Sequence, residues 1–200
     1  MKISDTSKIL NRLSLAYLYK VTLSKEPDLA NIRFSDIVPL LENIPRLRKA
    51  YLYKHQLDTF MALSSGRNVI LVSGTGSGKT EAWVLYALHT HCKTLAIYPN
   101  LALSADQLRR IKQYGTVVGL KVMEVNADIA RILQEQKEKV NADIVITNPA
   151  YLMTEVKAGG RVLGNFLRDL NLIVIDELAF YGSSRAALLL MIIKIMIEFM

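Results

Sequence analysis

The segment SGTGSGKT, from Ser73 to Thr80, carries the residue types that hold a chain of phosphates. Its glycines let backbone N–H groups point inward around phosphate oxygens, and a following helix adds positive potential at its N-terminus. Lys79 suits the β- and γ-phosphates, and the Thr80 hydroxyl suits Mg²⁺. We therefore predict a nucleotide-binding loop made of Ser73, Gly74, Thr75, Gly76, Ser77, Gly78, Lys79 and Thr80.

One position of this loop departs from the strict pattern, which has glycine five residues before Gly78 where this chain has Ser73. We expect a small residue to suffice there. An apolar run precedes the loop, and the helix-forming segment EAWVLYALH follows it. Strand, loop and helix therefore occur in the order that phosphate binding requires.

A second candidate site follows the apolar run NLIVI, where Asp176 and Glu177 stand side by side. In phosphoryl transfer, an aspartate at a strand end holds the Mg²⁺ that bridges the β and γ oxygens, and a neighbouring carboxylate orients and deprotonates the attacking water. An Asp-Glu pair alone is more often a helix cap or a solvated turn. Coupled to the loop upstream, it predicts Asp176 as the metal residue and Glu177 as the base, with Lys79 as the third catalytic group.

The elements that position these residues are short apolar runs alternating with helical segments from about residue 67 onward. Five runs are candidate strands: NVILVSG, TLAIYP, KVMEV, ADIVIT and NLIVIDE. Their nearly continuous Val, Ile and Leu content indicates strands covered on both faces, which favours a doubly wound, mostly parallel α/β sheet flanked by helices. Residues 1–50 are expected to form a helical N-terminal accessory segment, and residues 51–200 the α/β domain.

The composition limits the partners and the compartment. The excess of 25 Lys and Arg over 18 Asp and Glu gives a net charge of +7, which favours polyanionic partners. The lone Cys92 excludes an internal disulfide framework and indicates a reducing, cytoplasmic setting. The apolar segment from 186 to 200 is shorter than the ~20 residues of a membrane span, so we expect a buried helix and no membrane partner. For one basic and aromatic cluster we favour a solvated surface over nucleic acid contact: Arg46, Arg48, Lys49, Tyr51, Tyr53 and Lys54.

Three more segments accompany the two sites: YKHQ at 53–56, YPNLALSADQLRR at 98–110 and TNPAYLM at 147–153. Together with the loop and the Asp-Glu pair, they resemble the motifs of superfamily 2 (DExH/DEAD-type) helicases in their first, N-terminal RecA-like domain. The second segment and DELAFYG are most similar to DNA helicases of the RecQ-like and Lhr-like groups. The resemblance covers the chain from about residue 50 onward and implies a RecA-like P-loop NTPase domain.

The resemblance also implies roles for residues that the chemistry alone does not assign. Gln56 is implied to read adenine, and ATP and Mg²⁺ are the implied cofactors. Nucleic acid, with DNA preferred, is the implied partner. Six loop residues are implied to contact its sugar-phosphate backbone: Pro99, Asn100, Gln107, Thr147, Asn148 and Pro149.

Two departures limit what the resemblance implies. The fourth residue of the second motif, usually His or Asp, is Ala179, which puts in doubt the coupling of the nucleotide site to its partners. Leu101 replaces a common Lys or Arg and so removes a phosphate contact. Family members place the nucleotide between two RecA-like domains, and the second supplies arginines.

No second half of the phosphate site appears in the sequence. We therefore expect a second RecA-like domain, in the full-length chain or a partner chain, and weak binding with slow hydrolysis by this chain alone. The main expectation is an ATP-dependent nucleic acid helicase motor domain. Three alternatives stay open: an RNA helicase, a translocating subunit of a restriction or remodelling complex that does not separate strands, and a degenerate module that does not hydrolyse ATP.

Overall fold

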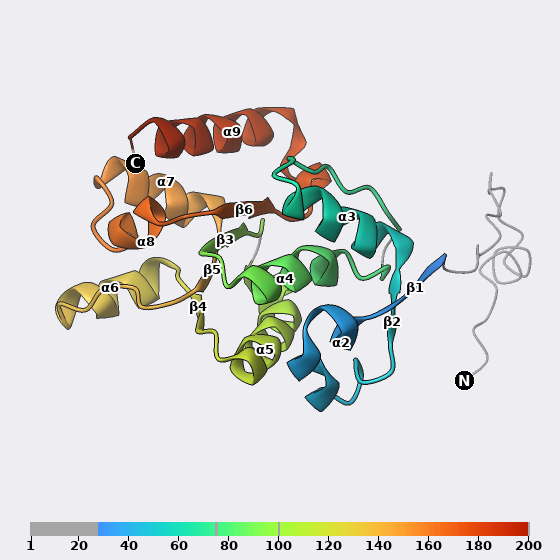
Figure 1. Cartoon of the computed structure of the whole chain (residues 1–200). Coiled ribbons are helices and arrows are strands. Elements are labelled where there is room, and N and C mark those ends of the chain that lie inside the picture. The colour runs from blue at the N-terminus through green and yellow to red at the C-terminus, as the bar shows by residue number, and fades with distance from the viewer. Residues whose placement is uncertain (1–27, 75, 100, 200) are drawn as a thin grey trace, which may run out of the picture.

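A four-stranded parallel sheet forms the centre of the computed structural model, which describes residues 28–74, 76–99 and 101–199 (Figure 1). Every pairing is parallel, and β3 and β5 are buried throughout. Strands covered on both faces explain the nearly continuous apolar runs. This confirms the predicted α/β class. The strand order is β4-β5-β3-β6, formed by Val122–Glu124, Ile144–Thr147, Thr94–Ile97 and Leu172–Ile175.

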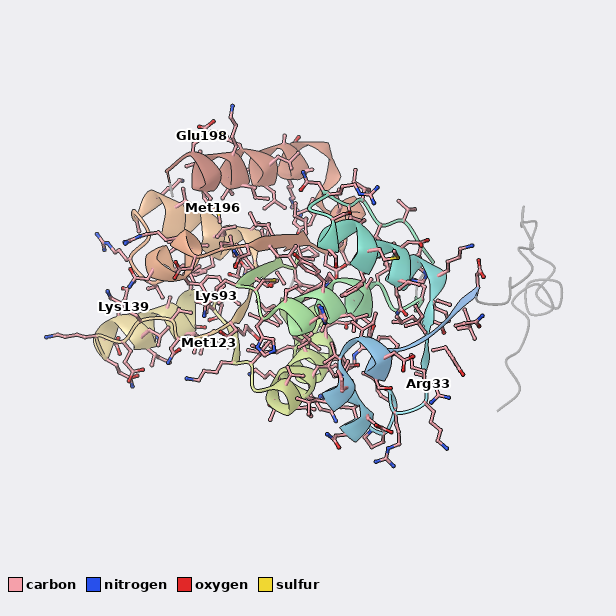
Figure 2. The ribbon with its side chains drawn as sticks, in the orientation of Figure 1. Arg33, Lys93, Met123, Lys139, Met196 and Glu198 are labelled. Carbon is pink, nitrogen blue, oxygen red and sulfur yellow. The ribbon has the colours of Figure 1, made fainter. Side chains whose placement is uncertain are left out.

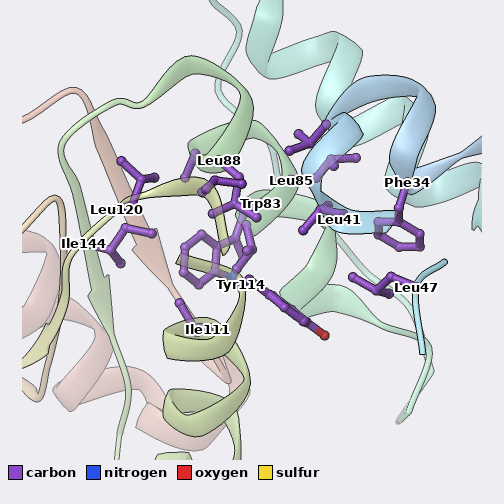
Figure 3. Packing of buried hydrophobic residues seen from close by; sticks show 14 of the residues in the cluster. Phe34, Leu41, Leu47, Trp83, Leu85, Leu88, Ile111, Tyr114, Leu120 and Ile144 are labelled. Atoms are coloured by element: carbon purple, nitrogen blue, oxygen red, sulfur yellow. The ribbon is translucent and has the colours of Figure 1, made fainter. Parts of the chain in front are cut away.

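Helices cover both faces of the sheet, because alternate side chains of each strand point to opposite sides. Ala96, Ile144 and Ile146 face one core, which contains α4 (Lys79–Thr90) and α5 (Leu101–Val118). Figure 3 shows this packing around Trp83, Leu88 and Tyr114. The opposite side chains of the sheet face a second core built by α6 (Ala127–Glu135), α7 (Pro149–Lys157), α8 (Gly164–Arg168) and α9 (Gly182–Phe199).

The part of the N-terminal segment that the structure describes is not only helical. β1 (Leu29–Arg33) pairs antiparallel with β2 (Tyr51–Tyr53), and between them lie α2 (Phe34–Ile37) and the 3-10 helix η1 (Pro39–Asn43). The strand β1 corrects the expectation of short helices alone. It forms because β2, directly before α3 (Lys54–Ser64), offers it a pairing edge. Residues 1–27 lie outside the described residues.

The first predicted strand, residues 68–74, is extended chain without a strand partner in the described part of the protein. Ile70 and Val72 are each 88% exposed, while the residues between and beside them are half-buried. The prediction of a buried strand is therefore wrong here. The described sheet ends at β6, and the segment 68–74 forms no ladder along the outer edge of that strand.

The apolar helix α9 is buried on one face only. Leu189, Ile192 and Met196 pack into the second core, whereas Leu188 and Met191 are exposed. Figure 2 shows Glu198 pointing away from the sheet. The expected helix is present, but the expectation that it is buried holds for one face alone. Among the described helices, none combines the length and apolar character that crossing a membrane requires.

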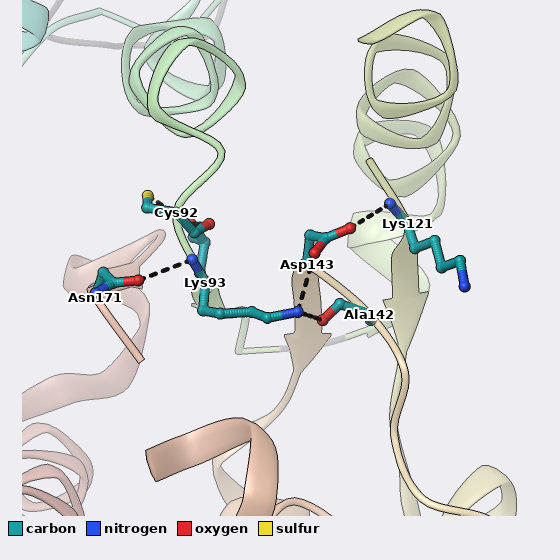
Figure 4. A network of polar contacts seen from close by, with 7 residues as sticks. Cys92, Lys93, Lys121, Ala142, Asp143 and Asn171 are labelled. Carbon is teal, nitrogen blue, oxygen red and sulfur yellow. Dashed lines mark hydrogen bonds and ion pairs between the residues drawn. The ribbon is translucent and has the colours of Figure 1, made fainter. Parts of the chain in front are cut away.

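A small polar network connects the residues directly before β3 and β5, at the N-terminal ends of these strands (Figure 4). The Lys93 ammonium donates to the Asp143 carboxylate at 2.9 Å, and the Lys121 backbone N–H donates to its second oxygen at 2.8 Å. Burial acts to raise the pKa of Asp143, but these hydrogen bonds and the Lys93 charge outweigh it and lower the pKa from its ordinary 3.8.

We therefore expect Asp143→Asn to destabilise the fold in a pH-dependent way. A carboxyl with a lowered folded-state pKa contributes stability above its ordinary value and loses it as the pH falls through the folded pKa. The variant should lose at most about 1 kcal/mol at pH 7, because solvent still reaches this half-buried carboxylate and screens its interactions. Urea unfolding at pH 7 and pH 3 measures the difference. An equal loss at both pH values would contradict the proposed role of the charge.

Candidate nucleotide site

The phosphate loop connects the extended segment 68–74 to the N-terminus of α4. Gly76 and Gly78 adopt left-handed backbone angles, with φ of 76° and 75°. At Gly78 a Cβ would also displace the amide nitrogen of Gln56 from its place beside the loop. The Lys79 ammonium donates to the carbonyl oxygens of Ser73 (3.2 Å) and Gly74 (2.9 Å), so it lies over the loop that it is predicted to serve.

Ser73 fits the loop without strain. It is not among the described non-glycine residues with positive φ, so glycine's extra backbone freedom is not needed there. Its hydroxyl lies 2.7 Å from the Ser77 hydroxyl and links the two sides of the loop. The serine that departs from the strict pattern is therefore compatible with this conformation. Thr75 lies outside the described residues.

The carboxylate pair stands directly after β6. The Asp176 N–H donates to the Ile97 carbonyl at 3.0 Å, which extends the pairing of β6 with β3 by one residue. Glu177 is exposed and adopts a left-handed φ of 53°, a conformation that non-glycine residues seldom take outside functional or strained positions. The 3-10 helix η2 (Leu178–Tyr181) begins immediately afterwards.

One cavity of about 380 Å³ brings the two predicted sites together, a size typical of small-molecule sites. Lys79 and Thr80 line it from α4, and Asp176 and Glu177 line it from the end of β6. Its other walls come from α3, from α5 and from the segment before residue 54. The predicted hydrolytic residues therefore face a common space.

Gln56 is 2% exposed and links the start of α3 to the phosphate loop. Its side-chain oxygen accepts from the Tyr53 N–H at 2.9 Å, and its amide nitrogen donates to the Gly78 carbonyl at 2.8 Å. His55 Nε2 lies 3.0 Å from the Ser77 carbonyl oxygen. The start of α3 thus holds the phosphate loop in place. The contact of Gln56 with adenine stays a prediction.

An ion-pair network around Glu81 was not predicted from the sequence. Glu81 is 6% exposed, and its carboxylate pairs with Arg46 and with Arg110, the latter at 3.4 Å. The Tyr114 hydroxyl donates to the same carboxylate at 3.2 Å. Burial is the main cause that raises the pKa of Tyr114, and the Glu81 charge adds to it. Arg46 is thus paired at the cavity wall while 44% of its side chain stays exposed, which agrees with the favoured solvated interpretation. The sequence signal was an acidic residue directly after Gly-Lys-Thr.

Two buried tyrosines lie beside Asp176. Tyr98, directly after β3, is 4% exposed, and its pKa is raised by burial and then by the Asp176 charge, with Thr80 as a further polar neighbour. Burial and Asp176 also raise the pKa of Tyr181. Both hydroxyls lack a hydrogen-bond partner in the part of the chain that the structure describes. Neither residue belongs to a motif position to which the sequence assigned a role.

The predicted nucleic acid residues do not share one surface role. Thr147 is fully buried, and its hydroxyl donates to the Val125 carbonyl at 2.7 Å, so this side chain is occupied inside the fold. Asn148 caps α7 by accepting from the Tyr151 N–H at 2.9 Å, and Pro149 follows it at the first turn.

The other predicted contacts lie near α5. Gln107 lines the nucleotide cavity, and Pro99 lies in the half-buried turn before the helix. Asn100 lies outside the described residues. Contacts of the six residues with nucleic acid stay predictions. Within the described residues, no cluster of three or more His, Cys, Asp or Glu is placed to hold a metal ion.

The parallel sheet, the phosphate loop and the carboxylate pair at a neighbouring strand end define a nucleoside-triphosphate-binding α/β domain. More narrowly, residues 53–198 match the DEAD/DEAH box helicase family, and the chain belongs to this family.

Relatives in sequence include the ATP-dependent helicase HRQ1 of Saccharomyces cerevisiae, which is 30% identical over 141 residues, or 64% of this chain and 13% of HRQ1. The helicase YprA of Bacillus subtilis is 28% identical over 137 residues, or 65% of this chain and 18% of YprA. An RNA helicase, ddx46 of Dictyostelium discoideum, is also similar, with 28% identity over 154 residues, or 69% of this chain and 13% of ddx46. This chain thus spans less than a fifth of the length of each.

The fold is similar to that of the helicase MrfA solved with DNA and AMPPNP, with a TM-score of 0.73 and 24% identity over 88% of this chain and 26% of MrfA. A hypothetical ATP-dependent RNA helicase from Sulfolobus tokodaii gives a TM-score of 0.62 and 25% identity over 81% of this chain and 46% of that one. The likeness to MrfA supports the predicted RecA-like fold.

We expect Glu81→Gln to destabilise the fold by about 1–3 kcal/mol, because it leaves two arginines without their carboxylate. Urea unfolding provides the measurement. Glu135→Gln on α6 is the matched control, since Glu135 is largely exposed and its removal should change stability by less than about 0.5 kcal/mol. Similar losses of unfolding free energy in the two variants would mean that the Glu81 ion pairs do not stabilise the fold more than an exposed pair does.

Proposed function

We propose that this chain is the ATP-binding motor domain of a helicase that hydrolyses ATP with Mg²⁺ and acts on nucleic acid, with DNA preferred. The observation that carries the proposal is the cavity that Lys79, Thr80, Asp176 and Glu177 line together. Each of these residue types has a defined part in phosphoryl transfer, and their common cavity supplies the required proximity. The alternative of a degenerate module is disfavoured because no member of this set is missing.

The residues present fit a magnesium ion. The Thr80 hydroxyl and the Asp176 carboxylate supply hard oxygen donors, which Mg²⁺ prefers, and they face the same cavity. When bound, Mg²⁺ neutralises charge on the β and γ oxygens. Lys79 is expected to exchange the carbonyls of Ser73 and Gly74 for phosphate oxygens, and Glu177 to orient the attacking water and accept its proton.

Two observations support nucleic acid as the partner and leave its type for experiment. The net charge of +7 suits a polyanion, and MrfA was solved with DNA. The RNA helicase names of ddx46 and of the Sulfolobus tokodaii protein keep RNA as the second candidate. Competition between DNA and RNA strands of matched sequence separates the two. Strand displacement by the full-length protein separates a helicase from a translocase.

We also propose that a second RecA-like domain, in the full-length protein or a partner, supplies the arginine that stabilises charge on the transferred phosphoryl group. Such an arginine is worth about 10³- to 10⁵-fold in rate, so this chain alone should turn over ATP very slowly. Slow turnover by this chain is therefore compatible with the proposal. The single Cys92 supports a cytoplasmic site of action.

Lys79→Ala should weaken ATP binding by about 10- to 100-fold in the presence of Mg²⁺, because it removes a charge-assisted contact with the phosphates. Calorimetric titration of ATP at matched salt provides the measurement. Lys112→Ala is the matched control, because Lys112 is exposed on α5 and does not line the cavity. Unchanged affinity in Lys79→Ala would refute the site.

Glu177→Gln should keep ATP affinity and lower hydrolysis by about 10²- to 10⁴-fold, the range for loss of a general base. The substitution preserves size and removes only the proton-accepting charge. Turnover is measured with DNA on the protein that also carries the second RecA-like domain, beside calorimetry of ATP binding. Wild-type turnover with normal binding would assign the base to another residue.

A further inference from the structure

Tyr98 is a buried polar residue at the junction of the elements that form the site. It directly follows β3, and its backbone N–H donates to the Thr147 carbonyl at 2.9 Å. The side chain is 4% exposed, and the hydroxyl has no hydrogen-bond partner among the residues that the structure describes. The hydroxyl therefore lies inside the fold without a bond that satisfies it.

An unsatisfied buried hydroxyl disfavours the folded state, whereas phenylalanine would fill nearly the same space without that cost. Packing alone thus gives no reason for tyrosine at this position. A group for which the free chain provides no good hydrogen bond is often one that acquires a partner in a functional state. The surroundings of the hydroxyl indicate which partner that is.

The polar groups around Tyr98 include the Asp176 carboxylate and the Thr80 hydroxyl, with the Arg110 charge also acting on it. The register explains their proximity: Ile97 pairs with Ile175, so the residues that follow, Tyr98 and Asp176, leave adjacent strands at the same level. A tyrosine hydroxyl, with an ordinary pKa of about 10, is protonated at neutral pH and can act as a hydrogen-bond donor. Tyr98 does not line the cavity, whereas both neighbours do.

We propose that Tyr98 is a positioning residue that acts through Asp176: its hydroxyl donates a hydrogen bond to the Asp176 carboxylate when Mg²⁺ and nucleotide are bound. This inference rests on the proposed function, because it assumes that Thr80 and Asp176 hold the metal. The bond would fix the orientation of the Asp176 carboxylate, which together with the Thr80 hydroxyl would hold the metal ion. Second contacts of this kind tune metal affinity without touching the metal.

Tyr98→Phe tests the proposal because it removes the hydroxyl alone. ATP affinity is measured by calorimetry with Mg²⁺ and again with EDTA, on this chain. The variant should bind ATP with Mg²⁺ about 3- to 10-fold more weakly and bind ATP in EDTA as the wild type does. The melting temperature of the nucleotide-free variant should be unchanged or higher, which a merely structural hydrogen bond would not produce.

Two comparisons make the outcome decisive. Tyr86→Phe, on the same helix as the phosphate-loop lysine and packed edge-on against Phe60, should leave both affinities unchanged. In an Asp176→Asn background, Tyr98→Phe should have no further effect on the Mg²⁺-dependent affinity, because its action passes through that carboxylate. Equal affinities of Tyr98→Phe and wild type with Mg²⁺, or additive effects in the double variant, would overturn the inference.

The same titrations keep this inference separate from the proposed function. If Lys79→Ala binds ATP normally, the nucleotide site itself is wrongly placed and the proposed function fails. If Lys79→Ala weakens binding as expected while Tyr98→Phe binds ATP with Mg²⁺ as the wild type does, only the role of Tyr98 fails.

Discussion

The parallel pairing of β3 with β6 is the interaction on which the candidate site depends. The register aligns Ile97 with Ile175, and the Asp176 N–H continues the ladder to the Ile97 carbonyl. Because the two strands end together, the carboxylate pair emerges beside the start of the next loop. Helix α4 packs over the same sheet and brings Thr80 to this edge. A shift of β6 by one residue would turn Asp176 to the other face of the sheet, away from Lys79 and Thr80.

The second constraint is electrostatic. A cavity for a polyphosphate needs positive charge, and that charge has to be held in place when no phosphate is bound. The structure does so in two ways: Lys79 lies on the loop carbonyls, and the two arginines of the wall share the buried Glu81 carboxylate. A buried carboxylate requires such partners, since an unpaired charge would be strongly destabilising. The same Glu81 thus offsets one of the two positive charges and links α4 to α5 through Arg110 and Tyr114.

The sequence predicted the parts of the fold and site that depend on local patterns. The phosphate loop, the carboxylate pair and the four strands of the sheet follow from short motifs and apolar runs. The rest depends on which partners a segment finds in space. Val72 has strand-forming neighbours but pairs with no described strand, and Leu188 belongs to an apolar helix of which only one face meets a core. The burial of Glu81 and Tyr98 follows from helices and strands distant in the sequence. No local pattern encodes these partnerships.

The cavity is lined by residues from both predicted segments, 1–50 and 51–200. The family match begins at residue 53, yet Phe34, Arg46 and Tyr51 line the same cavity as the phosphate loop. Figure 3 shows Phe34 and Leu47 next to Tyr114, within the core that also contains α4. The wall formed by residues 34–51 therefore belongs to the candidate site by packing, although it lies outside the region that matches the family. The residue types suited to phosphate chemistry lie in the matched region, while the opposite wall of the cavity is built from residues that precede it.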